Sequence, residues 1–227
     1  MSDQPTPTPP PPARDSPPPT AAAHPAPAHR LPTDTDSGLL LIISGPSGVG
    51  KTTITRAVER AIPGSVFSVS ATTRAKTAAD VEGVDYHFVD EPEFQRMIDD
   101  DEFLEHAGVF DKCYGTPRAW VFEQLRRGRL VILEIDVQGA QIVKAKVPDA
   151  FSLFIEPPSE DELLRRLRLR KREDDAKIQL RFAAAKAEIH TAHQCRIYNR
   201  FITNNLLDDA INEAIAAVST ELTRRKP

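Results

Sequence analysis

The sequence predicts an α/β fold with a central parallel sheet that helices cover on both faces. The first observation behind this prediction is that, from residue 38 onward, short apolar runs alternate with longer segments of helical periodicity. The second is a glycine-rich segment at residues 45–52, which lies between the first apolar run and the first helical pattern. The third is the length of 227 residues, which suits one domain with a small insertion and a tail.

The expected elements follow one another in a regular order. Apolar runs predict strands at Leu39–Ser44, Val66–Ser70, Leu130–Ile135, Ala150–Ile155 and Phe201–Thr203. Helical spacing of apolar residues predicts helices at Lys51–Ala61, Glu91–Asp100, Pro117–Arg127, Val137–Lys146, Ser159–Arg172, Asp174–His193 and Asp208–Arg225. The stretch Val81–Tyr114 alternates apolar and polar residues in short pieces, which predicts a small mixed insertion, partly antiparallel, beside the main sheet.

The first 36 residues differ sharply in composition from the rest of the chain. Pro, Ala, Thr and Ser dominate residues 1–36, and no aromatic residue occurs there. Such a segment cannot bury enough apolar surface to offset the entropy of ordering. We therefore expect a disordered proline-rich tail at 1–36, whose partner is unknown, and a folded domain at 37–227.

Charge and cysteine content exclude several function classes. A net charge of −4 gives no indication of a nucleic-acid or membrane partner, and no apolar run approaches the ~20 residues of a membrane span. The two cysteines, Cys113 and Cys195, have neither metal-ligand spacing nor a disulfide pattern. The N-terminus lacks the apolar core of a secretory signal, and we expect a cytoplasmic protein.

The most specific pattern of the chain follows the first predicted strand. Residues Gly45, Pro46, Ser47, Gly48, Val49, Gly50, Lys51 and Thr52 match G-x-x-x-x-G-K-[ST] in full. In P-loop NTPases, the backbone N–H groups of this loop and the following helix N-terminus surround phosphate oxygens. We expect Lys51 to reach the β- and γ-phosphates of ATP, Thr52 to bind Mg²⁺ and Thr53 to complete the ATP site. The motif predicts a nucleotide site and leaves the reaction open.

Five further segments carry the chemistry of a second site. Ser68–Arg74 places hydroxyls and an arginine at a strand end, where they can bind a phosphate and a polar base edge. The others are Gly83–Phe88, Phe103–Ala107, Tyr114–Thr116 and Leu133–Ala140. Each segment alone is weak evidence for any family, but this ordered set after a P-loop resembles the guanylate kinase family. The resemblance covers residues 38 to about 215.

The resemblance implies ATP as phosphoryl donor and GMP as acceptor. The residues implied to bind GMP are Ser70, Arg74, Tyr86, Glu105, Tyr114, Thr116 and Asp136. Arg74 and the two tyrosines would bind the phosphate, and the other four would lie at the guanine base. The chemistry of Glu105 agrees independently, because a carboxylate matches the adjacent N1–H and N2–H₂ donors of guanine. Adenine presents an acceptor at N1, so the same carboxylate would reject it.

Glu134 is the expected second metal residue. It ends the apolar run Leu130–Leu133, and a carboxylate at that place in such sheets lies beside the P-loop. There it can orient water molecules on Mg²⁺. The sequence therefore predicts a magnesium site at Thr52 and Glu134.

An arginine-rich segment predicts a mobile lid. Ser159 and Glu162 form a capping box that begins a helix. Arg166 and Arg170 are four residues apart and share a helix face, and Arg181 lies eleven residues beyond Arg170. Phosphoryl transfer needs positive charge on the transferring group and exclusion of water, which such a segment would supply.

The resemblance implies that Lys51, Arg170 and Arg181 are catalytic, and it adds Arg166 and Asn204 to the ATP site. It also divides the domain into three regions. These are a core at 37–70, 121–156 and 186–227, a GMP-binding region at 71–120 and a lid at 157–185.

Two departures from the family pattern bear on the rate. Thr77 stands where the family has a second phosphate-binding arginine, and Asp80 where it has a glutamate. Lys76 is the nearest cation, but lysine is a point charge without the guanidinium fork. In the lid, Lys171 replaces the usual glycine after Arg170, which favours a longer and stiffer helix.

Two alternative functions remain open at this point. A guanylate-kinase-like binding module without catalysis is disfavoured by Lys51 and the lid arginines and mildly favoured by Thr77. A related P-loop kinase for a sugar bisphosphate is disfavoured by Glu105, Tyr114 and Thr116, because a sugar acceptor needs no residues that recognise guanine. The sequence does not decide between a monomer and a homodimer.

Overall fold

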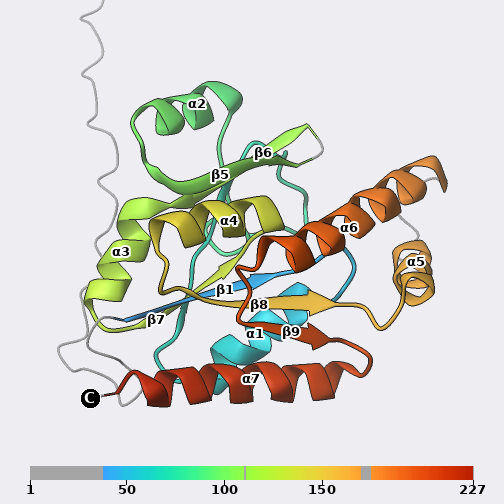
Figure 1. Ribbon diagram of the computed structural model, residues 1–227. Coiled ribbons are helices and arrows are strands. Elements are labelled where there is room, and N and C mark those ends of the chain that lie inside the picture. The colour runs from blue at the N-terminus through green and yellow to red at the C-terminus, as the bar shows by residue number, and fades with distance from the viewer. Residues whose placement is uncertain (1–37, 110, 170–174, 227) are drawn as a thin grey trace, which may run out of the picture.

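Two β-sheets and seven helices build the part of the chain that the computed structural model describes, residues 38–109, 111–169 and 175–226. One sheet is central and parallel, and the other is smaller, mixed and set to one side (Figure 1). The predicted α/β fold is confirmed. The expected disordered tail and Arg170 lie outside the described residues.

The central sheet has five strands in the order β2-β7-β1-β8-β9, and every neighbouring pair is parallel. The strands are β1 (Leu39–Ser44), β2 (Val66–Phe67), β7 (Leu130–Glu134), β8 (Phe151–Glu156) and β9 (Arg200–Thr203). All six residues of β1 are buried, as its continuous apolar run predicts for a middle strand covered on both faces.

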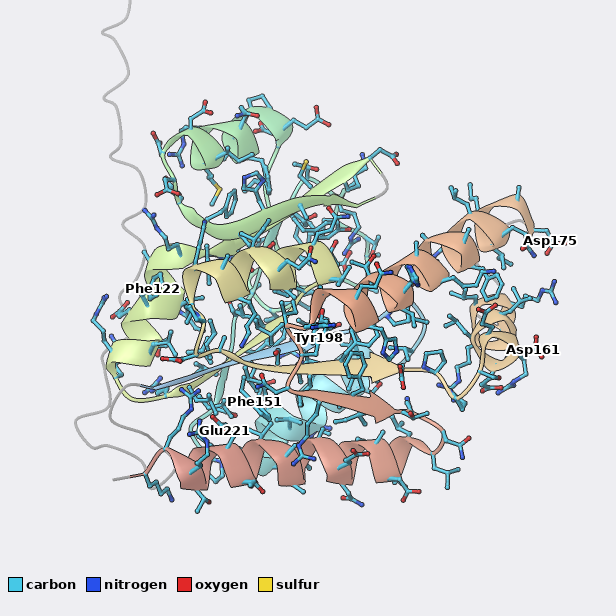
Figure 2. The ribbon with its side chains drawn as sticks, in the orientation of Figure 1. Phe122, Phe151, Asp161, Asp175, Tyr198 and Glu221 are labelled. Atoms are coloured by element: carbon cyan, nitrogen blue, oxygen red, sulfur yellow. The ribbon has the colours of Figure 1, made fainter. Side chains whose placement is uncertain are left out.

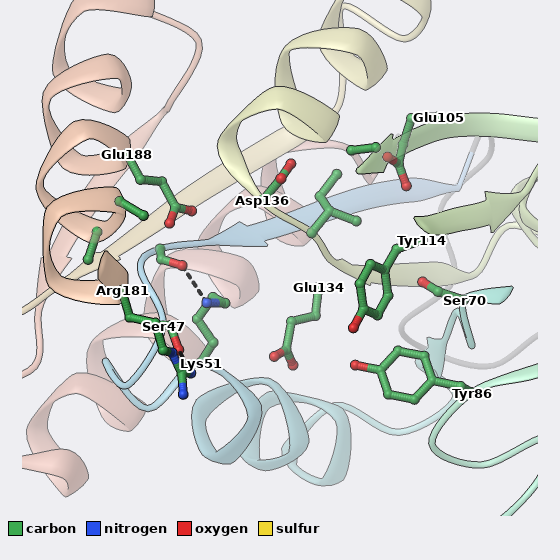
Figure 3. Close-up of a pocket in the computed structure, with 15 residues that line it drawn as sticks. Ser47, Lys51, Ser70, Tyr86, Glu105, Tyr114, Glu134, Asp136, Arg181 and Glu188 are labelled. Carbon is green, nitrogen blue, oxygen red and sulfur yellow. Dashed lines mark hydrogen bonds between the residues drawn. The ribbon is translucent and has the colours of Figure 1, made fainter. Parts of the chain in front are cut away.

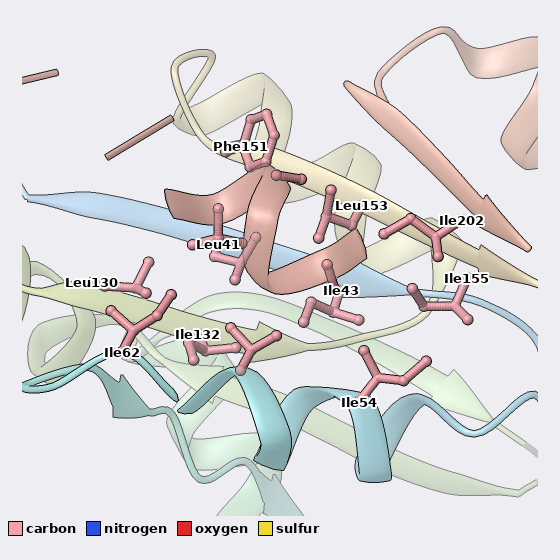
Figure 4. Packing of buried hydrophobic residues seen from close by; sticks show 14 of the residues in the cluster. Leu41, Ile43, Ile54, Ile62, Leu130, Ile132, Phe151, Leu153, Ile155 and Ile202 are labelled. Carbon is pink, nitrogen blue, oxygen red and sulfur yellow. The ribbon is translucent and has the colours of Figure 1, made fainter. Parts of the chain in front are cut away.

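Helices cover both faces of this sheet. On one face lie α1 (Lys51–Ala61) and α7 (Leu207–Arg224), and on the other α3 (Arg118–Arg126), α4 (Val137–Lys146) and α6 (Asp175–Cys195) (Figure 1). The core on the α1 side contains the alternate residues Leu41 and Ile43 of β1 with Leu153 and Ile155 of β8 and Ile54 of α1 (Figure 4). Leu40 and Ile42 point to the opposite core, which α3 and α4 cover.

The second sheet has the order β4-β3-β6-β5. Its strands are β3 (Ala71–Thr72), β4 (His87–Phe88), β5 (Phe103–Val109) and β6 (Lys112–Pro117), and α2 (Glu91–Asp99) packs on it through Phe94. The pairs β3–β6 and β5–β6 are antiparallel and β3–β4 is parallel, so the predicted mixed insertion is present. Asp90 begins α2 by accepting a hydrogen bond from the Glu93 N–H at 2.8 Å.

The helix α5 (Glu160–Leu169) and the first half of α6 form a separate unit beyond the carboxyl end of β8. They pack on each other through Leu163, Leu167, Ile178 and Ala185. Asp161 on α5 and Asp175 at the start of α6 lie at its outer end, far from the sheet (Figure 2). The P-loop glycine Gly48 faces this unit, because a Cβ there would lie 3.1 Å from Cδ2 of Leu167.

The observed elements differ from the expected ones mainly at their ends. The expected strand Val66–Ser70 is shorter, since the chain leaves the main sheet after Phe67 and enters the second sheet at Ala71. The expected helix Ser159–Arg172 is described only as far as Leu169. None of the helices in the described part of the chain is long and apolar enough to cross a membrane.

Candidate active site

The P-loop connects β1 to α1 at the carboxyl edge of the central sheet. Gly45 and Gly50 have φ values of 148° and 98°, a region that residues with a Cβ rarely adopt. A Cβ on Gly50 would also lie 2.8 Å from Nδ2 of Asn204. The two glycines therefore let the loop turn back over the end of β1 and pack against β9.

Lys51 is the first residue of α1, and its ammonium lies inside the curve of the loop. It donates to the carbonyl of Gly45 and, at 3.2 Å, to that of Pro46 (Figure 3). Arg181 on α6 donates to the Ser47 hydroxyl at the same loop. The structure thus brings Lys51 and Arg181, the two predicted catalytic cations within the described residues, to one phosphate loop.

Asn204 and Arg166 hold the loop from behind. Asn204 is buried after β9, and its Nδ2 donates to the Val49 carbonyl at 2.8 Å. Arg166 donates to the Asn204 carbonyl at 2.9 Å and pairs with Glu162 at 2.7 Å. Both residues brace the P-loop here, and their predicted contacts with ATP stay predictions.

Thr52 and Glu134 meet where β7 ends beside the P-loop. The Thr52 hydroxyl donates to Oε1 of Glu134 at 2.7 Å. Mg²⁺ in phosphoryl-transfer sites takes one or two protein oxygen ligands together with phosphates and water, and this hydroxyl–carboxylate pair fits such an ion. Thr53 is exposed on the next position of α1.

A cavity of about 420 Å³ joins the P-loop to the second sheet. On one side it is lined by Gly45, Ser47, Lys51 and Arg181, which we call the donor wall. On the other side it is lined by Ser70, Tyr86, Glu105 and Tyr114, which we call the acceptor wall (Figure 3). Glu134 and Asp136 lie between the two walls, so residues from 45 to 188 of the chain line one cavity.

Glu105 is the most buried charged group of the acceptor wall, with 4% of its surface exposed. An irregularity in the pairing of β5 with β6 lies between Phe103 and Glu105. Such a bulge interrupts the alternation of side chains, and it lets both Leu104 and Glu105 face α4. Directly across the strand pair, the Thr116 hydroxyl donates to Oε1 of Glu105 at 2.5 Å.

The environment of Glu105 disfavours its charged form. Burial raises the pKa of the Glu105 carboxyl to about 7, and the negative charge of Asp136 acts in the same direction. The hydrogen bond from Thr116 and the charge of Lys146 oppose this rise in pKa. A buried carboxylate with one oxygen held by Thr116 is suited to a ligand that brings its own N–H donors.

The two tyrosines of the acceptor wall stand side by side. The rings of Tyr86 and Tyr114 are 5.7 Å apart at their centroids, and both side chains point into the cavity (Figure 3). Burial raises the pKa of the Tyr86 phenol, so this hydroxyl keeps its proton and can donate to a phosphate oxygen.

Arg74 stands behind Tyr86 and is already paired. Its guanidinium donates to both carboxylate oxygens of Asp80, at 3.0 and 2.8 Å, and lies 5.1 Å from the Tyr86 ring centroid. Thr77 donates its N–H and its hydroxyl to the same carboxylate, each at 2.7 Å. These bonds hold the pKa of Asp80 well below its usual range. Asp80 therefore closes the loop 74–80 and orients Arg74, and neither Arg74 nor Thr116 is among the residues that line the cavity.

Asp136 has a structural role that the sequence motifs did not indicate. It precedes α4, and its Oδ1 accepts the Gly139 N–H at 2.8 Å as the N-cap. The same side chain lines the cavity. Its predicted contact with the guanine amino group is compatible with this position and stays a prediction.

Glu188 lines the cavity although no motif singled it out. It lies on α6 two helical turns after Arg181, and its carboxyl points toward the region of Lys51 and Asp136 (Figure 3). Burial raises the pKa of this carboxyl to about 7, while Lys51 and the Val137 N–H favour its charged form. The sequence signal that could have identified Glu188 is its position seven residues after Arg181, on the same helix face and within an alanine-rich run.

Comparisons with known proteins identify the family of the chain. The guanylate kinase family model matches residues 37–221. The guanylate kinase of Coxiella burnetii is 44% identical over 186 residues, which covers 82% of this chain and 89% of that protein. That of Paramagnetospirillum magneticum is 44% identical over 197 residues, covering 86% and 91%.

A solved structure gives the same answer at the level of the fold. The crystal structure of guanylate kinase from Anaplasma phagocytophilum superposes with a TM-score of 0.67 at 32% identity, and the match covers 83% of this chain and 88% of that one. With a family match over most of the described domain and a shared three-dimensional arrangement, the chain belongs to the guanylate kinase family.

Proposed function

We propose that the cavity between the two walls is where this guanylate kinase transfers the γ-phosphoryl group of ATP to GMP. The observation that supports the location is that a phosphate loop and a buried, base-reading carboxylate face each other across one cavity. Phosphoryl transfer requires donor and acceptor in line and close together. A cavity with a nucleotide phosphate site on one side and a nucleoside site on the other meets that requirement.

On the donor wall, Lys51 and Arg181 supply the positive charge. Phosphate oxygens of ATP would replace the carbonyls of Gly45 and Pro46 as acceptors for the Lys51 ammonium. Arg181, at the Ser47 hydroxyl, stands ready to neutralise charge on the transferring group. Arg170 would join them from the lid, in agreement with the family resemblance.

We assign the Mg²⁺ site to Thr52 and Glu134. The hydroxyl and the carboxylate lie 2.7 Å apart at the loop, which suits a small cation held mainly by phosphate oxygens and water. When bound, the ion supplies charge neutralisation and orientation of the phosphates. Glu134 fixes the Thr52 side chain in the orientation that this site needs.

On the acceptor wall, base and phosphate are bound by different groups. Glu105 would accept the guanine N1–H and N2–H₂ while Thr116 keeps its carboxylate in place. Ser70 and Asp136 would complete the contacts with the base. Tyr86, Tyr114 and Arg74 would bind the phosphate that receives the γ-phosphoryl group.

The helices α5 and α6 act in this proposal as a lid over the donor wall, with the region 71–120 as the GMP-binding part and the rest as core. Closure of such a lid excludes water, which would otherwise accept the phosphoryl group. We further propose a cytoplasmic location, in keeping with the free thiols of Cys113 and Cys195.

A coupled assay of ADP release tests the function and separates it from the two alternatives. We expect turnover with GMP, and a kcat/KM at least ~100-fold lower with AMP, UMP or ribose phosphates, because a site built on hydrogen bonds rejects analogues that lack them. No turnover with any acceptor would indicate a binding module instead. Preference for a sugar phosphate would contradict Glu105 as a guanine reader.

A further inference from the structure

Gly139 is the third residue of helix α4, and helix stability does not explain a glycine at this position. Glycine in a helix interior is less favourable than alanine, because it loses more backbone freedom on folding. The backbone of Gly139 is not in the left-handed region that would demand a glycine. Its surroundings, and not its backbone conformation, must therefore account for the missing side chain.

The carboxylate of Glu105 occupies the space that a side chain at this position would take. A Cβ built on Gly139 would lie 2.7 Å from Oε2 of Glu105 and 3.2 Å from its Cδ. Side-chain atoms do not approach each other that closely, so an alanine would displace the carboxylate. The carboxylate is the far end of a flexible side chain, and the backbone would not need to move.

The position of this carboxylate is defined from its other side as well. Its Oε1 accepts the Thr116 hydroxyl at 2.5 Å, and the bulge before Glu105 turns it toward α4. The N–H of Gly139 donates to Asp136 at 2.8 Å, and Asp136 lines the same cavity. Gly139 thus contacts Glu105 through its Cα face and Asp136 through its N–H, while its own surface is buried.

We propose that Gly139 is a positioning residue for guanine recognition. Because it has no side chain, the Glu105 carboxylate can pack directly against α4, where it meets the N1–H and N2–H₂ edge of the base. The inference rests on the proposed acceptor site. Gly139 itself need not touch GMP. A methyl group at this position would push the carboxylate off α4 and out of line with both guanine donors, and it would disturb the hydrogen bond from Thr116.

The substitution Gly139→Ala tests this inference, with Gly108→Ala as the matched control. Gly108 lies on β5 three residues after Glu105, and a Cβ there would meet nothing within 4 Å. We expect Gly139→Ala to lower kcat/KM for GMP by about ten- to a hundredfold, as loss of a charge-assisted contact does. The KM for ATP and the melting temperature should stay close to wild type, because alanine favours the helix. Gly108→Ala should behave as wild type in every measurement.

A double-mutant cycle with Glu105→Gln identifies the carboxylate as the group through which Gly139 acts. When Glu105→Gln has already weakened guanine recognition, adding Gly139→Ala should lower kcat/KM for GMP much less than Gly139→Ala does alone. Full additivity would overturn the inference, and so would wild-type use of GMP by Gly139→Ala. A variant that melts far below wild type would show a packing role instead and would also overturn it. If the wild-type protein itself does not use GMP, the proposed function fails, and that outcome is distinguishable from all of these.

Discussion

The donor wall and the acceptor wall of the cavity are built by different means. The donor wall is mostly loop backbone. Residues 45–50 connect β1 to α1, Lys51 at the start of α1 donates to carbonyls of that loop, and α6 adds Arg181. The acceptor wall consists of side chains from separate strands and loops of the mixed sheet. Its charged group, Glu105, is oriented by Thr116, and Arg74 behind the wall is oriented by Asp80 in the same way.

This difference decides how each wall responds to sequence change. A backbone site depends on few side chains, so most substitutions around it alter packing and leave the phosphate-binding N–H groups in place. A side-chain site can lose or exchange one member while its neighbours keep the rest in position. Thr77, which we predict to stand where the family has a second arginine, lies behind the acceptor wall in a loop that Asp80 closes.

The largest effect is expected at Lys51, the cation that the P-loop motif itself supplies to the donor wall. Lys51→Ala should lower kcat by roughly 100-fold or more, the usual cost of removing a main electrostatic contact to the transition state. The melting temperature should hardly change, since Lys51 belongs to no hydrophobic cluster. The measurement is turnover with saturating GMP and ATP, beside a thermal melt.

Lys144→Ala is the matched control for this substitution. Lys144 likewise donates to two backbone carbonyls, those of Pro148 and Ala150, but at the end of α4 away from the cavity. Its removal should leave turnover intact. If Lys51→Ala keeps more than about a tenth of wild-type turnover, the loop does not depend on this ammonium as assigned.

The second effect concerns Glu105 on the acceptor wall. Glu105→Gln should lower kcat/KM for GMP by about ten- to a hundredfold, because the amide presents a donor to one of two guanine donors. The KM for ATP should stay near wild type. Equal use of GMP and AMP by the wild-type enzyme would already rule out Glu105 as the residue that recognises guanine.

The pKa of Glu105 adds a pH dependence with a definite sign. The charged carboxylate accepts the guanine donors, and its pKa in the free protein is about 7. Binding is therefore favoured above pH 7, and kcat/KM for GMP should fall about tenfold per pH unit as pH decreases below 7. The GMP phosphate also titrates, near pH 6, and Glu105→Gln retains that contribution. A wild-type profile identical to that of Glu105→Gln would contradict this assignment.

The same contrast explains how much of the molecule could be predicted. Local patterns sufficed for the P-loop of the donor wall, because strand, loop and helix are contiguous in sequence and the continuous apolar run of β1 predicts a middle strand of a parallel sheet, whereas Arg181 was assigned by the family resemblance. The two-residue strands β3 and β4 carry no periodicity of their own, and the ion pair of Arg74 with Asp80 follows from how the loop folds. Family resemblance supplied the acceptor residues, but not their supports.

Glu188 and Gly139 show where such reasoning stops. Each is identified by what lies across the cavity or the helix interface: Lys51 and Val137 for Glu188, and the Glu105 carboxylate for Gly139. A glutamate in a helical run normally faces solvent, and a glycine in a helix is usually only a weak helix former. Their positions become informative only when α4, α6 and β5 are placed together.

The smallest effect is expected in the loop 74–80 behind the acceptor wall, where we predict a departure from the family pattern. A nucleoside monophosphate carries about two negative charges. Arg74 supplies one guanidinium, and Lys76 is the second cation nearby. The Lys76 ammonium lies 5.8 Å from the Phe88 ring centroid, and the Arg74 guanidinium lies 5.3 Å from the same centroid. We therefore expect Lys76 to substitute in part for the missing arginine.

Two substitutions separate the contributions of Thr77 and Lys76. Thr77→Arg should lower the KM for GMP by up to about tenfold, the lower end of what a charge-assisted hydrogen bond contributes, and should leave the KM for ATP unchanged. Lys76→Ala should raise the KM for GMP by about three- to tenfold, since a flexible ammonium holds a phosphate less firmly than an arginine fork.

Ala78→Arg is the control, because it adds the same charge to the exposed loop one position away from the family's arginine. If Ala78→Arg acts as strongly as Thr77→Arg, the gain is general attraction of an anion and not a restored contact. If neither Thr77→Arg nor Lys76→Ala changes the KM for GMP, another residue supplies the charge. The alignment of Ala75 to Asp80 with the family pattern would then be wrong, and the acceptor wall would bind its phosphate by a route of its own.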